Sequence, residues 1–196
     1  MKRAWMLAAA GLLAACATTQ LRDSWKDPAF SGPPMKRVMV VGVLKSDSNR
    51  RVFEDSFSQA LAASGTSAVA SYTKLPEAGT IANERLDAAV KDVGADAVLV
   101  TKVLRVKRDV DVQPGYMHGG FYGGGYRGYY RGAYMAMPPS VDVYDVLTVE
   151  STLWNMHTDK PVWSGTSEVT DPKAVSAATA ELAKVLIGKM KADGVI

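Results

Sequence analysis

The stretch AVLVTKVLRVKRDVDV, residues 97–112, decides the fold, because its apolar and polar side chains alternate over a length that suits a long strand. Two basic residues, Lys102 and Arg108, interrupt an otherwise apolar series at even positions: Val98, Val100, Leu104, Val106, Val110 and Val112. Successive side chains of a strand point to opposite faces, and antiparallel sheets commonly leave one face in water. We therefore predict a long antiparallel strand with one wet face.

The segments that follow supply its neighbours in the sheet. A second alternating series makes the natural hairpin partner: Val141, Val143, Leu147, Val149 and Leu153. Residues 157–160 predict a turn into a last strand over 161–169, and Asp171-Pro172 predicts the cap and first position of a helix. That helix has a buried stripe of Val175, Ala178, Leu182, Val185, Leu186 and Met190, with Lys184, Lys189 and Lys191 suited to its carboxyl end.

Upstream, two strand–helix units precede the long strand. Residues 38–44 are a short β-branched apolar run typical of a buried strand. A helix follows, capped by residues 46–49 and closed at Gly65. Its apolar side consists of Val52, Phe53, Phe57, Ala60 and Leu61, and its polar side of Arg50, Arg51, Glu54 and Asp55. A shorter strand over 68–72 leads to a second helix between Thr80 and Gly94, with the stripe Ala82, Leu86, Ala89, Val90 and Val93.

These elements predict an α/β (α+β) fold in the order β-α-β-α-β-β-β-α. We expect one mixed β-sheet with helices mainly on one face, forming a single domain over residues 35–196.

A long glycine- and tyrosine-rich hairpin insertion, residues 113–140, separates the two long strands. Residues 114–134 hold eight of the chain's 17 glycines and six of its eight tyrosines, with no acidic residue. Loops this long are usually functional or disordered. One hypothesis is a flexible tip. Another is an adhesive surface that binds a protein or a glycan through Tyr116, Phe121, Tyr122, Tyr126, Arg127, Tyr129, Tyr130, Arg131 and Tyr134.

Two further hypotheses for the insertion are weaker. A phosphate-binding loop joins a strand to a helix, whereas this segment joins two strands. Stacked aromatic rings with Arg127 and Arg131 suit single-stranded nucleic acid, but the cellular compartment predicted from the first residues argues against it.

Residues 1–15 have the features of a secretory signal peptide. Lys2 and Arg3 precede an apolar stretch over 5–15, which the polar run at 18–20 ends before the roughly 20 residues that a transmembrane helix needs. The sequence LAAC at 13–16 resembles the lipobox of bacterial lipoproteins. That resemblance implies cleavage before Cys16, diacylation of its sulfur and acylation of the new amino terminus, so the only expected cofactor is this covalent lipid. Ala17, where an aspartate would resemble the inner-membrane retention signal, favours the periplasmic face of the outer membrane.

Cleavage would leave 196 − 15 = 181 residues, about one domain's length. The net charge of +3 includes Lys2 and Arg3, so the remaining 21 basic and 20 acidic residues give no indication of a nucleic acid partner. Acylation would use the only cysteine and leave no internal disulfide. Residues 16–34 end in Pro33-Pro34 and predict a lipidated tether, with Trp25 and Phe30 packed onto the domain.

No catalytic constellation is visible in the sequence. His118 and His157, widely separated and without a free cysteine, make a poor metal set. Serine-elbow, zincin and nucleotide-loop motifs are absent from the sequence. Glu54 and Asp55 are interpreted as a solvated helix face. Asp142, Asp145 and His157 would indicate an enzyme only if they converged in a pocket.

Several motifs occur in the order seen in a family of uncharacterised proteobacterial outer-membrane lipoproteins, which the chain resembles over residues 16–196. They are WKDP at 25–28, RVFED at 51–55, SY at 71–72 with LP at 75–76, GADAVLVT at 94–101 and PVW at 161–163. The β-α-β-α start is also similar in topology to the amino-terminal domain of TolB, to the curli-secretion lipoprotein and to lipoprotein activators of penicillin-binding proteins. The resemblance implies a non-enzymatic periplasmic adaptor.

Together these observations predict a lipid-anchored envelope lipoprotein that binds a protein partner through the insertion. A glycan- or peptidoglycan-binding module is the alternative.

Overall fold

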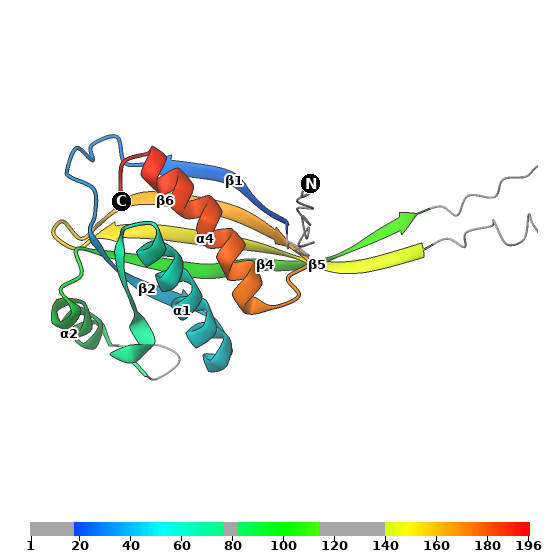
Figure 1. Ribbon diagram of the computed structural model, residues 1–196, viewed down its shortest axis with the longest axis horizontal. Helices are drawn as coiled ribbons and strands as arrows, with labels where there is room; N and C mark the ends of the chain where they lie inside the picture. Colours follow the sequence, from blue (N-terminus) through cyan, green and yellow to red (C-terminus); the bar gives the residue numbers. More distant parts are fainter. Residues whose placement is uncertain (1–17, 77–81, 114–139) are drawn as a thin grey trace, which may run out of the picture.

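In the computed structural model, which describes residues 18–76, 82–113 and 140–196, six strands form one mixed sheet (Figure 1). The order across the sheet is β1-β6-β5-β4-β2-β3. The strands are β1 (Thr18–Lys26), β2 (Arg37–Val43), β3 (Ser67–Ala70), β4 (Ala97–Gln113), β5 (Ser140–Asn155) and β6 (Lys160–Thr170). The helices are α1 (Asp47–Ala63), the short 3-10 turn η1 (Ser71–Thr73), α2 (Asn83–Val93) and α4 (Val175–Ala192). Apart from the additional strand β1, the elements follow the predicted order.

The sheet joins a parallel half to an antiparallel half. β2 pairs in parallel with β3 and β4, as expected where a helix connects consecutive strands. β4, β5, β6 and β1 then pair antiparallel. The connection between β5 and β6 is a turn at 156–159, one residue earlier than the predicted 157–160. The α/β (α+β) class with one mixed sheet is thus confirmed.

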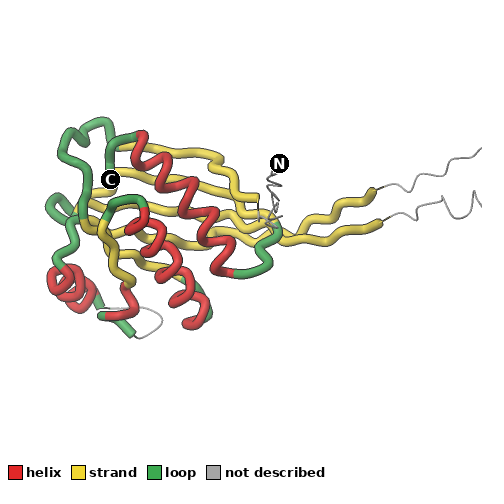
Figure 2. The backbone as a smooth tube through the Cα atoms, in the orientation of Figure 1, coloured by secondary structure: helices red, strands yellow, loops and turns green. Residues whose placement is uncertain are grey.

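Two helices cover one face of the sheet and one covers part of the other (Figures 1 and 2). The larger core lies under α1 and α4 and includes Phe57, Leu61, Leu99, Leu153, Trp163, Leu186 and Met190, all fully buried. A smaller core on the opposite face joins α2 to the sheet through Met39, Leu75, Ala89, Val90, Val93 and Val98. Alternation along β2 explains the division, because Val38 and Val40 face the larger core and Met39 faces the smaller one.

A β-bulge in β4 changes which residues face the helices. The pairing with β5 shifts between Val103 and Arg105, so Leu104 is the extra residue. Before the bulge, odd positions such as Leu99 face the larger core. After it, Val106 pairs with Leu147, which packs on that core, so even positions take this face. The expectation that even positions share one face over the whole strand is therefore wrong beyond residue 103.

The predicted tether, residues 16–34, includes a strand of the sheet. Residues 18–26 form β1, which pairs with β6 from Thr18↔Thr170 to Lys26↔Trp163. β1 satisfies the outer backbone groups of β6 and so becomes the edge of the sheet. Phe30 packs against the larger core as predicted, whereas Trp25 is 47% exposed.

Two local predictions near helices are also wrong. Asp171 and Pro172 do not start α4, whose cap is Ala174. Asp171 instead takes a left-handed backbone conformation, with φ at 52°, in the turn that precedes the helix. Glu54 does not lie on a solvated helix face, because its side chain is completely buried. The predicted helix ends at Gly65 and Gly94 are confirmed, since both residues have positive φ.

Candidate functional site

The two longest strands extend beyond the rest of the fold as a two-stranded ribbon (Figure 1). A 17-residue strand spans about 55 Å, whereas the 18 residues of α4 span about 27 Å. The last residue of β4 that pairs with β2 is Lys102, and the first residue of β5 that pairs with β6 is Val146. Among the described residues, 105–113 therefore pair only with β5, and 140–145 pair only with β4. We call these two segments the ribbon.

The ribbon has two different faces, which follow from its register. On the side of α1 and α4 lie Val106, Val110 and Val143, with 60%, 53% and 57% of their surfaces exposed. Val110 and Val143 are direct cross-strand partners. The opposite face carries Arg105, Lys107 and Asp109. The apolar side chains are exposed because no helix reaches this far along the strands.

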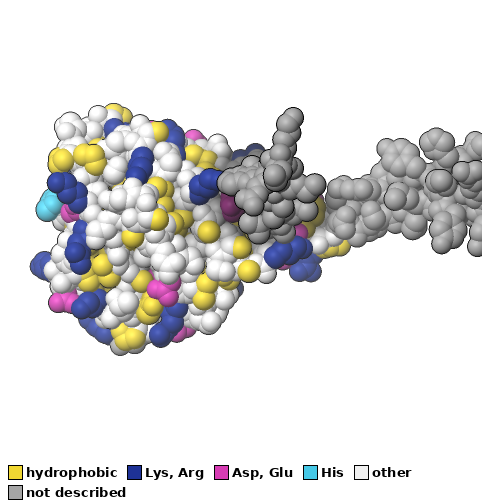
Figure 3. All heavy atoms as spheres, viewed as in Figure 1, with side chains coloured by type: hydrophobic (Ala, Val, Ile, Leu, Met, Phe, Trp, Pro, Cys, Tyr) yellow, Lys and Arg dark blue, Asp and Glu magenta, His cyan; other side chains and the backbone are white. Residues whose placement is uncertain are grey.

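One ion pair crosses the apolar face of the ribbon. Arg108 and Asp145 are cross-strand partners, with Nε 3.2 Å from Oδ1. Both side chains are exposed, so the pair contributes at most about 1 kcal/mol. On the charged face, a hydrogen bond donated by Lys107 holds the pKa of Asp109 below its ordinary value. Figure 3 shows hydrophobic and basic side chains together where the ribbon leaves the body.

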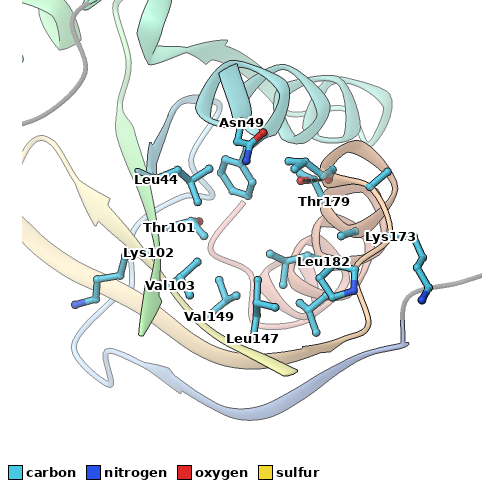
Figure 4. Close-up of a pocket in the computed structure, with 16 residues that line it drawn as sticks. Leu44, Asn49, Thr101, Lys102, Val103, Leu147, Val149, Lys173, Thr179 and Leu182 are labelled. Atoms are coloured by element: carbon cyan, nitrogen blue, oxygen red, sulfur yellow. Dashed lines mark hydrogen bonds between the residues drawn. The ribbon is translucent and has the colours of Figure 1, made fainter. Parts of the chain in front are cut away.

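An apolar cleft opens at the base of the ribbon, on the same face (Figure 4). Its volume is about 260 Å³. The apolar lining comes from the start of α1, the start of α4 and the sheet between them, and includes Leu44, Phe53, Val103, Leu147, Val149 and Leu182. Polar side chains are few: Asn49, Thr101 and Thr179 stand at its wall, while Lys102 and Lys173 point away from it (Figure 4). Leu147 joins the two features, since it lines the cleft and pairs with Val106 of the ribbon.

The loop between β6 and α4 forms one wall of this region. The backbone N–H of Asp171 donates to the carbonyl oxygen of Asp145 at 2.8 Å and so ties the loop to β5. Lys173 and Asp171 form an ion pair at 2.6 Å. A second hollow of about 210 Å³ lies between this loop and the ribbon, lined by Arg108, Val143, Tyr144, Asp145, Asp171 and Pro172. Pro172 borders both hollows.

The structure separates two of the residues that would have indicated an enzyme. Asp145 lies at the ribbon and His157 beyond the other end of β5, about 30 Å along the strand, so they do not converge in one pocket. Outside the described residues lie Cys16, Thr80 and the proposed binding residues Tyr116, Phe121, Tyr122, Tyr126, Arg127, Tyr129, Tyr130, Arg131 and Tyr134.

Sequence reasoning did not identify the cleft or the exposed valines. Their spacing is that of ordinary core residues, and the pattern of a strand does not show whether a helix covers it. The available signal was length, because strands of 17 and 16 residues greatly exceed the usual five or six.

The part of the chain formed by residues 18–76, 82–113 and 140–196 contains no group of three or more histidine, cysteine or acidic residues able to hold a metal ion. None of its helices combines the length and the apolar character needed to cross a bilayer.

No protein family model matches the chain, and no curated protein matches its sequence. Among solved structures, it is similar to the PelC dodecamer from Paraburkholderia phytofirmans, with 20% identity and a TM-score of 0.46 over 86% of this chain and 95% of that one. It is also similar to the lipoprotein GNA1162 from Neisseria meningitidis, with 14% identity and a TM-score of 0.43 over 80% of this chain and 99% of that one.

Proposed function

We propose that this chain is a non-enzymatic lipoprotein of the cell envelope, anchored at the periplasmic face of the outer membrane by lipid on Cys16. In this role it acts as an adaptor that binds a protein partner, and the ribbon is the contact. The single observation that carries the proposal is the ribbon's amphipathic form, with three exposed valines on the face continuous with the cleft.

The exposed valines favour a binding role over a purely structural one. Contiguous exposed apolar side chains mark interaction sites in soluble proteins. Here Val110 and Val143 are cross-strand partners, and beyond the Arg108–Asp145 pair Val106 and Leu147 lead to the cleft. Lys107 and Asp109 lie on the opposite face, and the charged residues of the valine face, Arg108 and Asp145, neutralise each other as an ion pair.

The free edges of the ribbon favour a protein partner. Among the described residues, the outer edges of 105–113 and 140–145 have no neighbouring strand. Such edges can pair with an added strand, whose backbone groups supply affinity while its alternate side chains supply specificity. The partner's contacting segment is therefore expected to be extended and apolar on one side.

Charged substitutions on the apolar face test the adaptor role. We expect Val110→Lys combined with Val143→Lys to reduce partner capture in cell crosslinking pull-downs, because two positions that the partner is expected to cover would become cationic. Both side chains are more than half exposed, so the free energy of unfolding should change by less than about 0.5 kcal/mol. The matched control is Val52→Lys, at an exposed valine of α1.

Deleting residues 115–134 tests the glycine–tyrosine segment separately. We expect this deletion to leave folding intact and to reduce partner capture as well. An unchanged capture profile in both the double variant and the deletion would overturn the adaptor role. Sedimentation with purified cell-wall sacculi distinguishes the glycan-binding alternative, since a protein adaptor stays in the supernatant.

A further inference from the structure

The apolar cleft is suited to a hydrocarbon chain. Leu147, Val149 and Val103 form its floor on the sheet, and Phe53 of α1 and Leu182 of α4 form its sides. The side chains drawn in Figure 4 surround the opening and leave its centre empty. A ligand that fills it must be mainly apolar, because the few polar groups of the wall cannot solvate a charge at its centre.

The size of the cleft sets the length of chain that it can hold. An apolar cavity of about 150 Å³ is large enough for benzene, with six carbons. On that scale, the 260 Å³ of this cleft admits roughly ten methylene groups. This is most of an acyl chain.

The start of the described chain lies next to the mouth of the cleft. Thr18 pairs with Thr170, and Pro172, two residues further on, lines the cleft. Cys16 precedes Thr18 by two residues. Two fully extended residues span about 7 Å, and this length applies both from Cys16 to Thr18 and from Thr170 to Pro172. The paired strands are about 5 Å apart, so Cys16 is at most about 19 Å from Pro172. An acyl chain that crosses half of a bilayer core reaches about 15 Å, and its glycerol linker adds to that reach.

We propose that the cleft receives one acyl chain of the lipid carried by Cys16 of the same molecule. The inference rests on the proposed lipid anchor. In this state the remaining acyl chains hold the protein at the membrane, since a lipoprotein with several chains keeps its attachment when one is withdrawn. The occupied cleft would place the ribbon base, at Leu147 and Val106, next to the anchor point.

Photocrosslinking from the lipid tests this proposal. Cells are fed a palmitate analogue with a terminal diazirine, the full-length protein is irradiated in intact membranes, and crosslinked peptides are identified by mass spectrometry. We expect crosslinks to the β5 and α4 peptides that contain Leu147, Val149 and Leu182. Ala178→Trp, which fills the cleft from α4, should lose them, and the matched Ala177→Trp, at an exposed position of the same helix, should retain them.

Three outcomes separate the possible failures. If the labelled protein crosslinks only to membrane lipid, or if Ala178→Trp gives the same cleft crosslinks as the wild type, the acyl chain does not occupy the cleft. The lipid anchor is unaffected by that result. Cleft crosslinks that persist in Cys16→Ser show that a free lipid is bound and overturn the proposal as well. Absence of label from the wild type overturns the anchor and the cleft proposal together. Ala178→Leu, a smaller filling substitution with the same expected loss, replaces Ala178→Trp if circular dichroism shows that the tryptophan variant is unfolded.

Discussion

At the scale of single residues, the buried carboxylate of Glu54 accepts three hydrogen bonds and forms one ion pair. One oxygen accepts from the backbone N–H of Gly42 at 3.0 Å and from Ser71 Oγ at 2.8 Å, and the other accepts from the N–H of Tyr72 at 2.8 Å. Arg50 lies one helical turn earlier and pairs with it at 3.4 Å. This buried carboxylate joins β2, α1 and η1, which explains why a charged residue occupies a helix position facing the core.

Neutralising Glu54 should strongly destabilise the protein. We expect Glu54→Gln to lower the free energy of unfolding by about 3–5 kcal/mol, because it removes the buried charge that pairs with Arg50 and replaces one of the two acceptor oxygens with a donor. Urea denaturation measures the change. Glu84→Gln, at an exposed position of α2, is the matched control, and a loss no larger than the control's would contradict the structural role of Glu54.

Asp193 supplies a pH-dependent contribution to stability. Burial raises its pKa, but hydrogen bonds from Lys189 at 2.6 Å and from Trp163 Nε1 at 2.9 Å favour the carboxylate more, so the pKa lies below its ordinary 3.8. A folded pKa below the unfolded one means that the stabilisation is complete above the unfolded value. It is lost as pH falls through the folded pKa.

We therefore expect Asp193→Asn to be less stable than the wild type at pH 7, with the difference shrinking as the pH falls below about 4. Thermal unfolding over this range measures it. Lys189→Met should reduce the same difference, since it removes one of the two donors. A difference that does not depend on pH would contradict the account.

At the scale of elements, β6 is built around the contact between Trp163 and Gly165. A Cβ atom at Gly165 would lie 2.4 Å from the indole of Trp163, closer than atoms can approach. The indole is fully buried and donates to Asp193 in the turn after α4. The glycine therefore lets the strand hold the ring that connects the sheet to α4.

Gly165→Ala should lower the free energy of unfolding by about 1–3 kcal/mol, because the indole must move and strain its hydrogen bond. Gly188→Ala is an informative control, since a Cβ there meets nothing within 4 Å and helix propensity should raise stability by about 0.5–1 kcal/mol. Opposite signs in chemical denaturation are expected. Equal effects would contradict the packing argument.

The elements also show how far the sequence determines the structure. Periodicity predicted three helices and five of the six strands, because each buries a regular apolar stripe. It missed β1, whose side chains are mostly polar since an edge strand is held largely by backbone hydrogen bonds to β6. It also missed the bulge at Leu104, because even positions are apolar on both sides of it. Before the bulge they face the smaller core, and after it they face the side of α1 and α4.

The candidate site was less predictable for a physical reason. Val110 is a core residue if α4 covers it and a possible contact residue if α4 does not reach so far along β4. The length of a helix, as read from the sequence, does not tell where along a strand the helix packs. The burial of Glu54 likewise depends on donors from Gly42, Ser71 and Tyr72, which are distant in sequence from one another. Contacts between elements, rather than patterns within them, decide both.

At the scale of the whole molecule, three features meet at one end of the sheet. β1 begins there, the apolar cleft opens there and the ribbon starts there. In the proposed arrangement the lipid of Cys16 is therefore attached near the base of the ribbon, and the turn at His157 lies at the opposite end of β5.

The lipid on Cys16 underlies both the adaptor role and the occupant of the cleft, so its detection is the most direct test. Cells that express the wild type or Cys16→Ser are grown with radiolabelled palmitate, and the immunoprecipitated protein is analysed. We predict label on the wild-type protein and its loss from the serine variant. Equal labelling of the two proteins, or none on the wild type, would contradict the anchor.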